Sequence, residues 1–262
     1  MSDSNGVPFT DGKFYEKNFD SKEYLKSFDV YPSSYEGFLP FMLRHLHNTF
    51  SSGNLEGKRL IDIGSGPTIY AIISASRCFE EIVLSDIADG NRREIEKWLK
   101  NEKGCFNWRP IIQFVCELEG RSRSPEEVER RLRKIVKQVL RCDVLLENPF
   151  HPLKVEPVDC VLSSLCLEAA CKDQGTYRRV LRSIAALLNP GGVLVLLGVL
   201  DQSYYREGKQ TFSTLALSQS AIEEMLTDQG FTVKQVETLP ATEKQKKSCD
   251  GNAFFYLFAQ KK

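Results

Sequence analysis

The sequence has no long hydrophobic run. Its longest nearly unbroken apolar stretch spans residues 193–200, far short of the ~20 residues that a helix needs to cross a bilayer. The first eight residues are polar and include an acid where a secretion signal would carry basic and then apolar residues. We therefore expect no membrane span and no export, and we expect a cytoplasmic protein.

Net charge is also absent, because 35 Lys and Arg residues are balanced by 35 Asp and Glu residues. A neutral protein has no global field that draws it to polyanions, so neither nucleic acid nor an anionic membrane is an expected partner. A small-molecule ligand fits this balance better. We expect the chain to act as a monomer.

Metal ligands are scarce. The chain has only three histidines, and no two of its eight cysteines form a C-x-x-C pair. Zinc sites in proteins normally combine several such ligands at short spacing, so no metal is expected. In a chain without an export signal, scattered cysteines are better interpreted as free thiols that pack as small core residues.

What the chain does contain is enough apolar sequence for one sizeable domain: 262 residues, of which 42% are hydrophobic. From residue 58 onward, short apolar runs alternate with amphipathic segments, which is typical of βαβ units and a largely parallel, doubly wound α/β sheet. We predict strands at residues 59–63, 82–85, 111–116, 158–163, 193–200, 231–237 and 254–259. We predict helices between them at residues 68–77, 91–100, 176–188 and 220–228.

Residues 1–55 precede this pattern and are helical in character and rich in aromatic residues. Asp20 and Ser21 can cap a first helix that extends to Phe28, and a second helix is predicted at about residues 34–50. We interpret residues 1–55 as a helical cover that belongs to the same domain as residues 56–262.

An insertion follows the predicted third strand. Ser124, Pro125 and Glu127 form the sequence signature of a helix start with a capping box. Apolar residues then recur at helical spacing as far as Val139, and Arg and Lys fill the positions between them. The basic residues suit either a binding surface or a solvated helix face, and the solvated face is the favoured interpretation.

The segment from Leu60 to Tyr70 is an apolar strand that leads into a glycine turn. Gly64 and Gly66 allow the backbone to turn tightly and to approach a ligand at the carboxyl edge of the sheet. Asp86 ends the next strand about twenty residues later, where a carboxylate can accept hydrogen bonds from ribose hydroxyls. A strand-end Asp is often only a turn cap, but the two features together indicate an adenosine-type cofactor.

Two cofactors fit this pattern, NAD and S-adenosylmethionine. The third glycine of the dinucleotide motif is replaced by Ile69, and no catalytic Tyr-Lys or His pattern of an NAD-dependent oxidoreductase is evident. A Pro-Gly-Gly turn at residues 190–192 leads into a central strand, and its entry resembles that of class I methyltransferases.

Six short motifs in order make the resemblance more specific. They are Ile61-Asp-Ile-Gly-Ser-Gly-Pro-Thr-Ile-Tyr70, Ile95-Glu-Lys-Trp-Leu-Lys100, Cys116-Glu-Leu-Glu-Gly120, Arg141-Cys-Asp-Val144, Asp159-Cys-Val-Leu-Ser163 and Ser203-Tyr-Tyr205. The chain resembles the nicotinamide, indolethylamine and phenylethanolamine N-methyltransferase family from about residue 19 to residue 260. The resemblance implies a seven-stranded, mostly parallel Rossmann-like sheet and a class I S-adenosylmethionine-dependent methyltransferase.

The resemblance also implies which residues bind S-adenosylmethionine and its product S-adenosylhomocysteine. These residues are Tyr24, Gly64, Ser65, Gly66, Thr68, Tyr70, Asp86, Asn91, Asp143, Val144 and Ser164. Each has an alternative structural role. The tyrosines could be core aromatics, Asp143 a turn residue, and Asn91 the N-cap of a helix.

Methyl transfer from a sulfonium is an in-line displacement with an activated donor. The enzyme therefore needs alignment, water exclusion and an unprotonated nucleophile more than a strong base, and we assign no catalytic residue. Aromatic residues of the N-terminal cover can exclude water and stabilise positive charge, although some of them only pack the cover onto the sheet. These residues are Tyr15, Phe19, Tyr24, Phe28, Tyr31 and Tyr35.

Substrate choice is less well specified. In the nicotinamide-methylating members of the family an Asp follows the Pro-Gly-Gly turn where this chain has Gly198, and Phe28-Asp29 replaces a tyrosine pair. Asp201 can replace the missing acid or can cap a loop. The resemblance places the substrate near Asp201, Tyr204, Tyr205, Ser213 and Thr214.

We therefore expect an indolethylamine-type enzyme that methylates small amines and also accepts thioethers. Nicotinamide N-methylation is the alternative. A non-catalytic cofactor-binding protein on the same fold is the alternative from another class.

Overall fold

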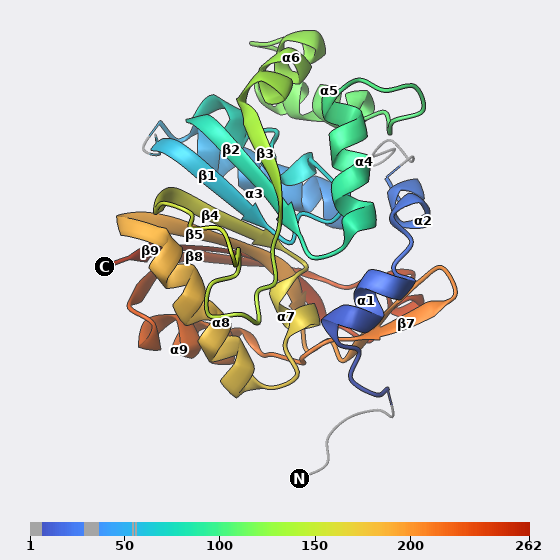
Figure 1. Cartoon of the computed structure of the whole chain (residues 1–262), viewed down its shortest axis with the longest axis vertical. Coiled ribbons are helices and arrows are strands. Elements are labelled where there is room, and N and C mark those ends of the chain that lie inside the picture. The colour runs from blue at the N-terminus through green and yellow to red at the C-terminus, as the bar shows by residue number, and fades with distance from the viewer. Residues whose placement is uncertain (1–6, 29–36, 54, 56) are drawn as a thin grey trace.

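A computed structural model of the chain describes residues 7–28, 37–53, 55 and 57–262. Its centre is a seven-stranded sheet in the order β3-β2-β1-β4-β5-β9-β8 (Figure 1). Strand β9 pairs antiparallel with β5 and β8, and the other pairs are parallel. The strands are β1 Gly57–Ile63, β2 Phe79–Asp86, β3 Val136–Arg141, β4 Val158–Ser164, β5 Leu188–Leu200, β8 Phe231–Pro240 and β9 Ala253–Lys261. The expected doubly wound α/β fold is confirmed.

Helices cover both faces of the sheet, so the side chains of the central strands are buried on both sides and are almost all apolar. One face is covered by α3 Phe38–Ser51, α4 Asp89–Leu99, α5 Arg109–Leu118 and α6 Pro125–Ile135. The other face is covered by α7 Leu167–Ala170, α8 Gln174–Leu187 and α9 Gln219–Asp228. Two short helices, α1 Gly12–Asn18 and α2 Ser21–Lys26, lie beside the hairpin of β6 Tyr204–Glu207 and β7 Gln210–Ser213 (Figure 1).

The predicted third strand is wrong, because residues 111–116 belong to helix α5. A short apolar run fits a buried strand and one face of a buried helix equally well. Here Pro110 stands in the first turn, and Ile111, Ile112 and Val115 are buried on the same side of the helix. The chain therefore reaches the sheet again only at Val136.

The third strand of the sheet is β3, which the sequence predicts as the end of the insertion helix. Helix α6 does begin at the predicted capping box of Ser124 and Glu127, but it ends at Ile135. Residues from Val136 to Arg141 are extended and pair with β2. This pairing is made by backbone hydrogen bonds with β2. The periodicity of the side chains at residues 136–141 therefore does not indicate a strand.

The predicted helix at residues 68–77 is also wrong, because two 3-10 turns, η1 Tyr70–Ile72 and η2 Ala75–Arg77, occupy this stretch. In the N-terminal region, Asp20 caps α2 as predicted, although that helix ends at Lys26. The second predicted helix corresponds to α3, and residues 34–36 of its predicted start lie outside the described residues. Helix α1 and the β6–β7 hairpin were not predicted.

Several basic side chains of α6 attach the helix to the body of the protein. Arg131 donates hydrogen bonds to the carbonyl oxygens of Ser76 and Phe79. The guanidinium of Arg133 lies 4.5 Å from the ring centre of Trp98. These contacts are structural, so they give no support to a basic binding surface. In the part of the chain that the structure describes, no helix is long and apolar enough to span a membrane.

Candidate cofactor and substrate site

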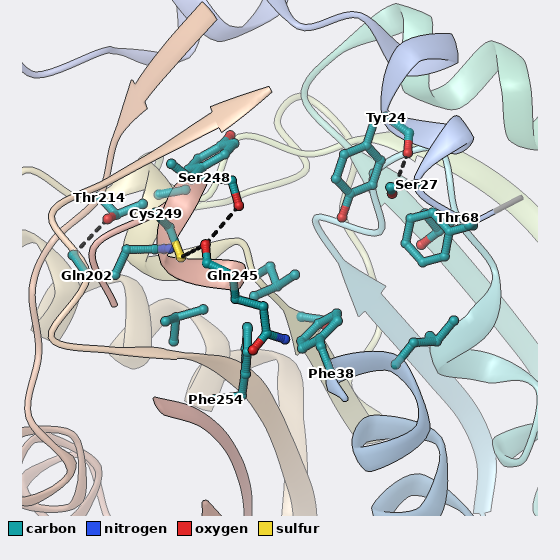
Figure 2. Close-up of a pocket in the computed structure, with 18 of the residues that line it drawn as sticks. Tyr24, Ser27, Phe38, Thr68, Gln202, Thr214, Gln245, Ser248, Cys249 and Phe254 are labelled. Atoms are coloured by element: carbon teal, nitrogen blue, oxygen red, sulfur yellow. Dashed lines mark hydrogen bonds between the residues drawn. The ribbon is translucent and has the colours of Figure 1, made fainter. Parts of the chain in front are cut away.

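Two adjoining hollows open at the carboxyl edge of β1, β2 and β4. The larger has a volume of about 780 Å³ and extends from the glycine turn to the segment between β8 and β9 (Figure 2). The smaller, of about 90 Å³, lies beside Asp86. Both are lined by Tyr15, Gly64 and Tyr205, so the two hollows form one candidate site.

The glycine turn is shaped by two different requirements. Gly64 has a φ of +69°, and a Cβ there would lie 2.1 Å from the Sγ of Cys166, so only glycine fits. Gly66 has a φ of +59° and open space around it, so it is favoured by backbone conformation alone. Ser65 fixes the turn to β2, because its hydroxyl donates to the carbonyl oxygen of Ser85 at 3.0 Å.

Asp86 stands at the centre of a buried hydrogen-bond cluster. Its carboxylate accepts from the backbone N–H of Gly66 at 2.9 Å, from the N–H of Ala88 at 2.8 Å and from the amide of Asn91 at 3.0 Å. Asn91 also donates to the hydroxyl of Tyr15 and accepts from that of Ser21. Asn91 lines neither hollow, so it supports Asp86 from behind. It is not an N-cap, because α4 begins at Asp89.

The site is acidic before any ligand enters. Burial raises the pKa of Asp86, against the lowering effect of its hydrogen bonds. Asp62, one position before the end of β1, is 1% exposed, and burial followed by the neighbouring Asp86 raises its pKa to about 8. The Oδ1 atom of Asp62 has no hydrogen-bond partner among the described residues. Asp62 lines neither hollow and holds its proton below about pH 8, whereas Asp86 lines the smaller hollow and favours a ligand that is cationic or donates hydrogen bonds.

The smaller hollow combines three acids, Asp11, Asp86 and Asp143, with apolar walls. Asp143 and Val144 line it, together with Ile87, Cys142 and Leu145. The carboxylate of Asp143 also accepts from the N–H of Leu145 at 3.0 Å, so its turn role and a ligand role coexist. An acceptor next to flat apolar contacts fits an adenine ring with its amino group.

The aromatic residues of the cover lie over the larger hollow. Tyr24 and Phe28 line it, and the ring of Phe28 stacks on that of Tyr70 with centres 5.6 Å apart. The hydroxyl of Tyr70 hydrogen bonds to that of Ser164 at 2.6 Å. Figure 2 shows Tyr24 and Thr68 on the same side of the cavity. The predicted cover residues Tyr31 and Tyr35 lie outside the described residues.

The predicted substrate residues separate into three groups. Tyr205 and Thr214 line the larger hollow. Ser213 lines the smaller one, where it hydrogen bonds to Thr10 of the N-terminal segment at 3.0 Å. Tyr204 lines an outer groove, because successive side chains of β6 point to opposite sides. Asp201 lines none of these hollows and accepts from Asn252 at 3.2 Å.

Glu168 is a site residue that the sequence did not reveal. It lies on α7, is 6% exposed and lines the larger hollow. Its carboxylate accepts from the N–H of Val199 at 3.3 Å, and burial raises its pKa to about 7. No motif identifies this position. The available signal was its place shortly after β4, at the edge of the sheet where ligands bind.

Glu168 also explains what Gly198 does. A Cβ at Gly198 would lie 2.6 Å from the Oε1 of Glu168 and 2.6 Å from the Cε1 of Phe255. The space that an acidic side chain from β5 would use is therefore already filled. Among the described residues that line the larger hollow, Glu168 is the single acid.

Several solved structures share the fold of this chain at low sequence identity. The structure aligns with the magnesium protoporphyrin IX methyltransferase of Synechocystis, solved with bound S-adenosylmethionine, over 99% of this chain and 100% of that chain (TM-score 0.53, 15% identity). It aligns with the N-methyltransferase NodS of Bradyrhizobium japonicum, solved with S-adenosylhomocysteine, over 92% and 98% (TM-score 0.52, 11% identity). It also aligns with a [4+2]-cyclase, SpnF, over 98% and 99% (TM-score 0.58, 14% identity). Because a cyclase shares the fold, the fold alone does not determine the reaction.

Sequence comparison is more specific. The chain is 46% identical to the indolethylamine N-methyltransferase of Oryctolagus cuniculus over 231 residues, which are 87% of this chain and 88% of that protein. It is 43% identical to human nicotinamide N-methyltransferase over 234 residues (88% and 89%), and 38% identical to human phenylethanolamine N-methyltransferase over 230 residues (86% and 81%). The family model described as "NNMT/PNMT/TEMT family" matches residues 7–262. The chain therefore belongs to the NNMT/PNMT/TEMT family and is an S-adenosylmethionine-dependent methyltransferase.

Proposed function

We propose that this methyltransferase transfers the methyl group of S-adenosylmethionine to the nitrogen of a small, indolethylamine-type amine, and that thioether sulfur is a further acceptor. The observation that carries the proposal is the continuity of the larger hollow from the glycine turn to Glu168. It allows a donor held at the turn and an acceptor held beside Glu168 to meet without water between them. The names of the relatives support amines as the acceptor class.

The cofactor is held, in this proposal, by the residues that line the two hollows around Gly64. Asp86 accepts the ribose hydroxyls, and Asp143 with Val144 receives the adenine. The turn, with Thr68, Tyr70 and Ser164, surrounds the methionine portion. When bound, the cofactor supplies an activated methyl group on a cationic sulfur. Asp86, which lines the smaller hollow, favours that charge when it is ionised.

Residues 1–55 act as a cover over this site. Tyr15, Tyr24 and Phe28 of the cover line the larger hollow, and the bond between Asn91 and Tyr15 links the cover to the cofactor side. Rings in this position exclude water and face a sulfonium without competing for protons.

Glu168 orients the amine. Its carboxylate is buried and points into the larger hollow from α7. When ionised, it accepts a hydrogen bond from the amine N–H and leaves the nitrogen lone pair directed at the methyl group. It can also accept the proton that the product releases. Because the pKa of Glu168 is raised to about 7, this acceptor is present mainly above neutral pH.

A change of Glu168→Gln tests this role. We expect kcat/KM for the amine to fall by about 10- to 100-fold, because a charge-assisted hydrogen bond is lost. The rise in kcat/KM that reflects deprotonation of the amine should remain in both proteins, but the additional inflection near pH 7 should be lost in the variant. Glu224→Gln is the control, since Glu224 is exposed on α9 and pairs with Arg178. A pH profile that is the same in both variants would contradict the assignment.

Nicotinamide is the alternative acceptor. The resemblance implies that family members which methylate nicotinamide carry an acid at the position of Gly198. In this chain, a Cβ at Gly198 would meet Glu168 and Phe255, so there is no room for an acidic side chain. This disfavours nicotinamide. A non-catalytic binding protein is disfavoured because the hollow opens from the cofactor side to an acid with a near-neutral pKa.

A radiolabelled-methyl assay decides among these acceptors. Purified protein is incubated with labelled S-adenosylmethionine and tryptamine, phenethylamine, nicotinamide or dimethyl sulfide in parallel. We expect label in tryptamine or phenethylamine at higher kcat/KM than in nicotinamide. Transfer to nicotinamide alone would replace the proposal by its alternative. Cofactor binding without any transfer would favour the non-catalytic protein.

We infer, finally, a monomeric enzyme in the cytoplasm. All eight cysteines are free thiols, and five of them are buried. Unpaired cysteines are typical of proteins in a reducing compartment. Sedimentation and fractionation of cells test these two inferences.

A further inference from the structure

The outer wall of the larger hollow is built by the segment between β8 and β9, residues 241–252. It contains the 3-10 turn η3 Gln245–Lys247. The segment is tied to the β6–β7 hairpin, because the N–H of Arg206 donates to the carbonyl oxygen of Ser248 at 2.8 Å. The two ends of the segment are joined, because the N–H of Ala241 donates a hydrogen bond to the carbonyl oxygen of Asn252. In Figure 2, Gln245 and Ser248 stand across the cavity from Tyr24 and Thr68.

Two cations belong to this wall. Arg206 from β6 and Lys244 from the segment both line the larger hollow. Neither forms an ion pair with any residue that the structure describes, whereas the adjacent Lys246 pairs with Glu243 at 3.2 Å. Arg206 also lines the outer groove together with Tyr204, and its guanidinium lies 5.3 Å from the ring centre of Tyr204, so this side chain stands at the border between the groove and the larger hollow.

One acid lines the outer groove together with Arg206, and it already accepts several hydrogen bonds. Asp250 shares the outer groove with Arg206. Its carboxylate accepts from the N–H groups of Ser203 and Tyr204, at 2.8 and 3.2 Å, and from the hydroxyl of Ser203. The cations of the wall therefore face a hollow whose only described acid is Glu168.

The larger hollow is thus polarised along its length. Glu168 is buried at its inner end, beside the backbone of β5, and it suits the amine. Arg206 and Lys244 are exposed and therefore belong to the outer part of the hollow, which Gln245 and Ser248 also line. A ligand that matches both ends carries a nitrogen at one end and a negative charge at the other. A carboxylate fits the outer part of the hollow, because an arginine guanidinium binds it through two parallel hydrogen bonds and its single negative charge balances that of the guanidinium.

We propose that the preferred substrate is an amine that carries a carboxylate at its far end, and that Arg206 and Lys244 bind that carboxylate. The inference rests on the proposed N-methylation and specifies its substrate class. Because both cations are exposed to solvent, their effect is expected to be moderate and reduced by salt.

The test compares three matched amines: phenethylamine, its para-carboxylate derivative and its para-carboxamide derivative. In the unmodified protein we expect kcat/KM for the carboxylate to exceed that for the carboxamide by about tenfold. Arg206→Gln and Lys244→Gln should each lower the ratio of carboxylate to carboxamide by about three- to tenfold, mainly through KM. Added salt should lower the same ratio in the unmodified protein.

Lys247→Gln is the matched control, because Lys247 lies in the same turn but does not line the hollow. Its ratio should equal that of the unmodified protein. The inference is overturned if the carboxylate is not preferred over the carboxamide, or if Lys247→Gln loses as much of this preference as Arg206→Gln. In either case, methylation of phenethylamine still upholds the proposed function. If none of the three amines is methylated although tryptamine is methylated in the four-acceptor assay, the inference fails alone. Absence of transfer to every acceptor removes both.

Discussion

Asp86 combines a binding role with a structural one. Three hydrogen bonds from Gly66, Ala88 and Asn91 hold its carboxylate, so removing the whole side chain would leave buried donors unpaired as well as weaken the ligand. The hydrogen bonds show that asparagine, which keeps the size and one acceptor, is the cleaner change.

We expect Asp86→Asn to weaken the binding of S-adenosylhomocysteine by about 1–3 kcal/mol, because charge-assisted hydrogen bonds to the ribose are lost. Isothermal titration measures this change. Asp228→Asn, an exposed position on α9 that pairs with Arg178, is the control. Equal affinity in both variants would place the ribose elsewhere.

Asp62 makes stability depend on pH. Its pKa is raised from an ordinary value of 3.8 to about 8, so between these values the folded protein holds a proton that the unfolded chain releases. Stability is therefore lost as pH rises through this window, with a slope of at most about 1.4 kcal/mol per pH unit. Urea unfolding of the cofactor-free protein at a series of pH values measures it. In Asp62→Asn the slope of stability against pH should be smaller, and we attribute the slope that remains to Glu168. Identical pH profiles of stability for the variant and the unmodified protein would refute the assignment.

At the scale of elements, the apolar run of α5 and the mixed run of β3 show where the sequence pattern fails. Residues 111–116 are apolar enough for a buried strand, yet they form a helix because their buried face packs against α3. Residues 136–141 carry exposed polar side chains and still form a strand, because β2 supplies the hydrogen bonds. In both cases a neighbouring element overrides local preference.

The starts of helices with side-chain caps were predicted well at Asp20 and Ser124, and α6 offers a test. The hydroxyl of Ser124 accepts from the N–H of Glu127 at 3.2 Å, and the carboxylate of Glu127 accepts from the N–H of Ser124 at 2.7 Å. We expect Ser124→Ala to lower the free energy of unfolding by about 0.5–2 kcal/mol, measured by chemical denaturation. Ser122→Ala, at an exposed neighbouring position, should change it by less than about 0.5 kcal/mol. Similar losses in both variants would mean that the cap contributes little.

The whole molecule should be stabilised by its cofactor product. A ligand that binds only the folded state adds about 2.7 kcal/mol at one hundred times its Kd, which corresponds to about 5 °C in Tm for a chain of this size. Differential scanning fluorimetry with S-adenosylhomocysteine should show this shift, and NAD at the same concentration should not. A shift with NAD instead would revive the dinucleotide hypothesis that the incomplete glycine pattern disfavours.

The sequence by itself determined the α/β class, the glycine turn and the acid at the end of the following strand, because these features depend on local backbone geometry and on short spacings. It also carried the family resemblance. Only the tertiary structure decided that Glu168 enters the substrate hollow, that Asp201 and Tyr204 do not, and that Arg206 and Lys244 share one wall. Those placements bring together residues from α7, β6 and the segment after β8, and distances between segments so far apart in the chain are set by packing of the sheet and its helices, which no local pattern encodes.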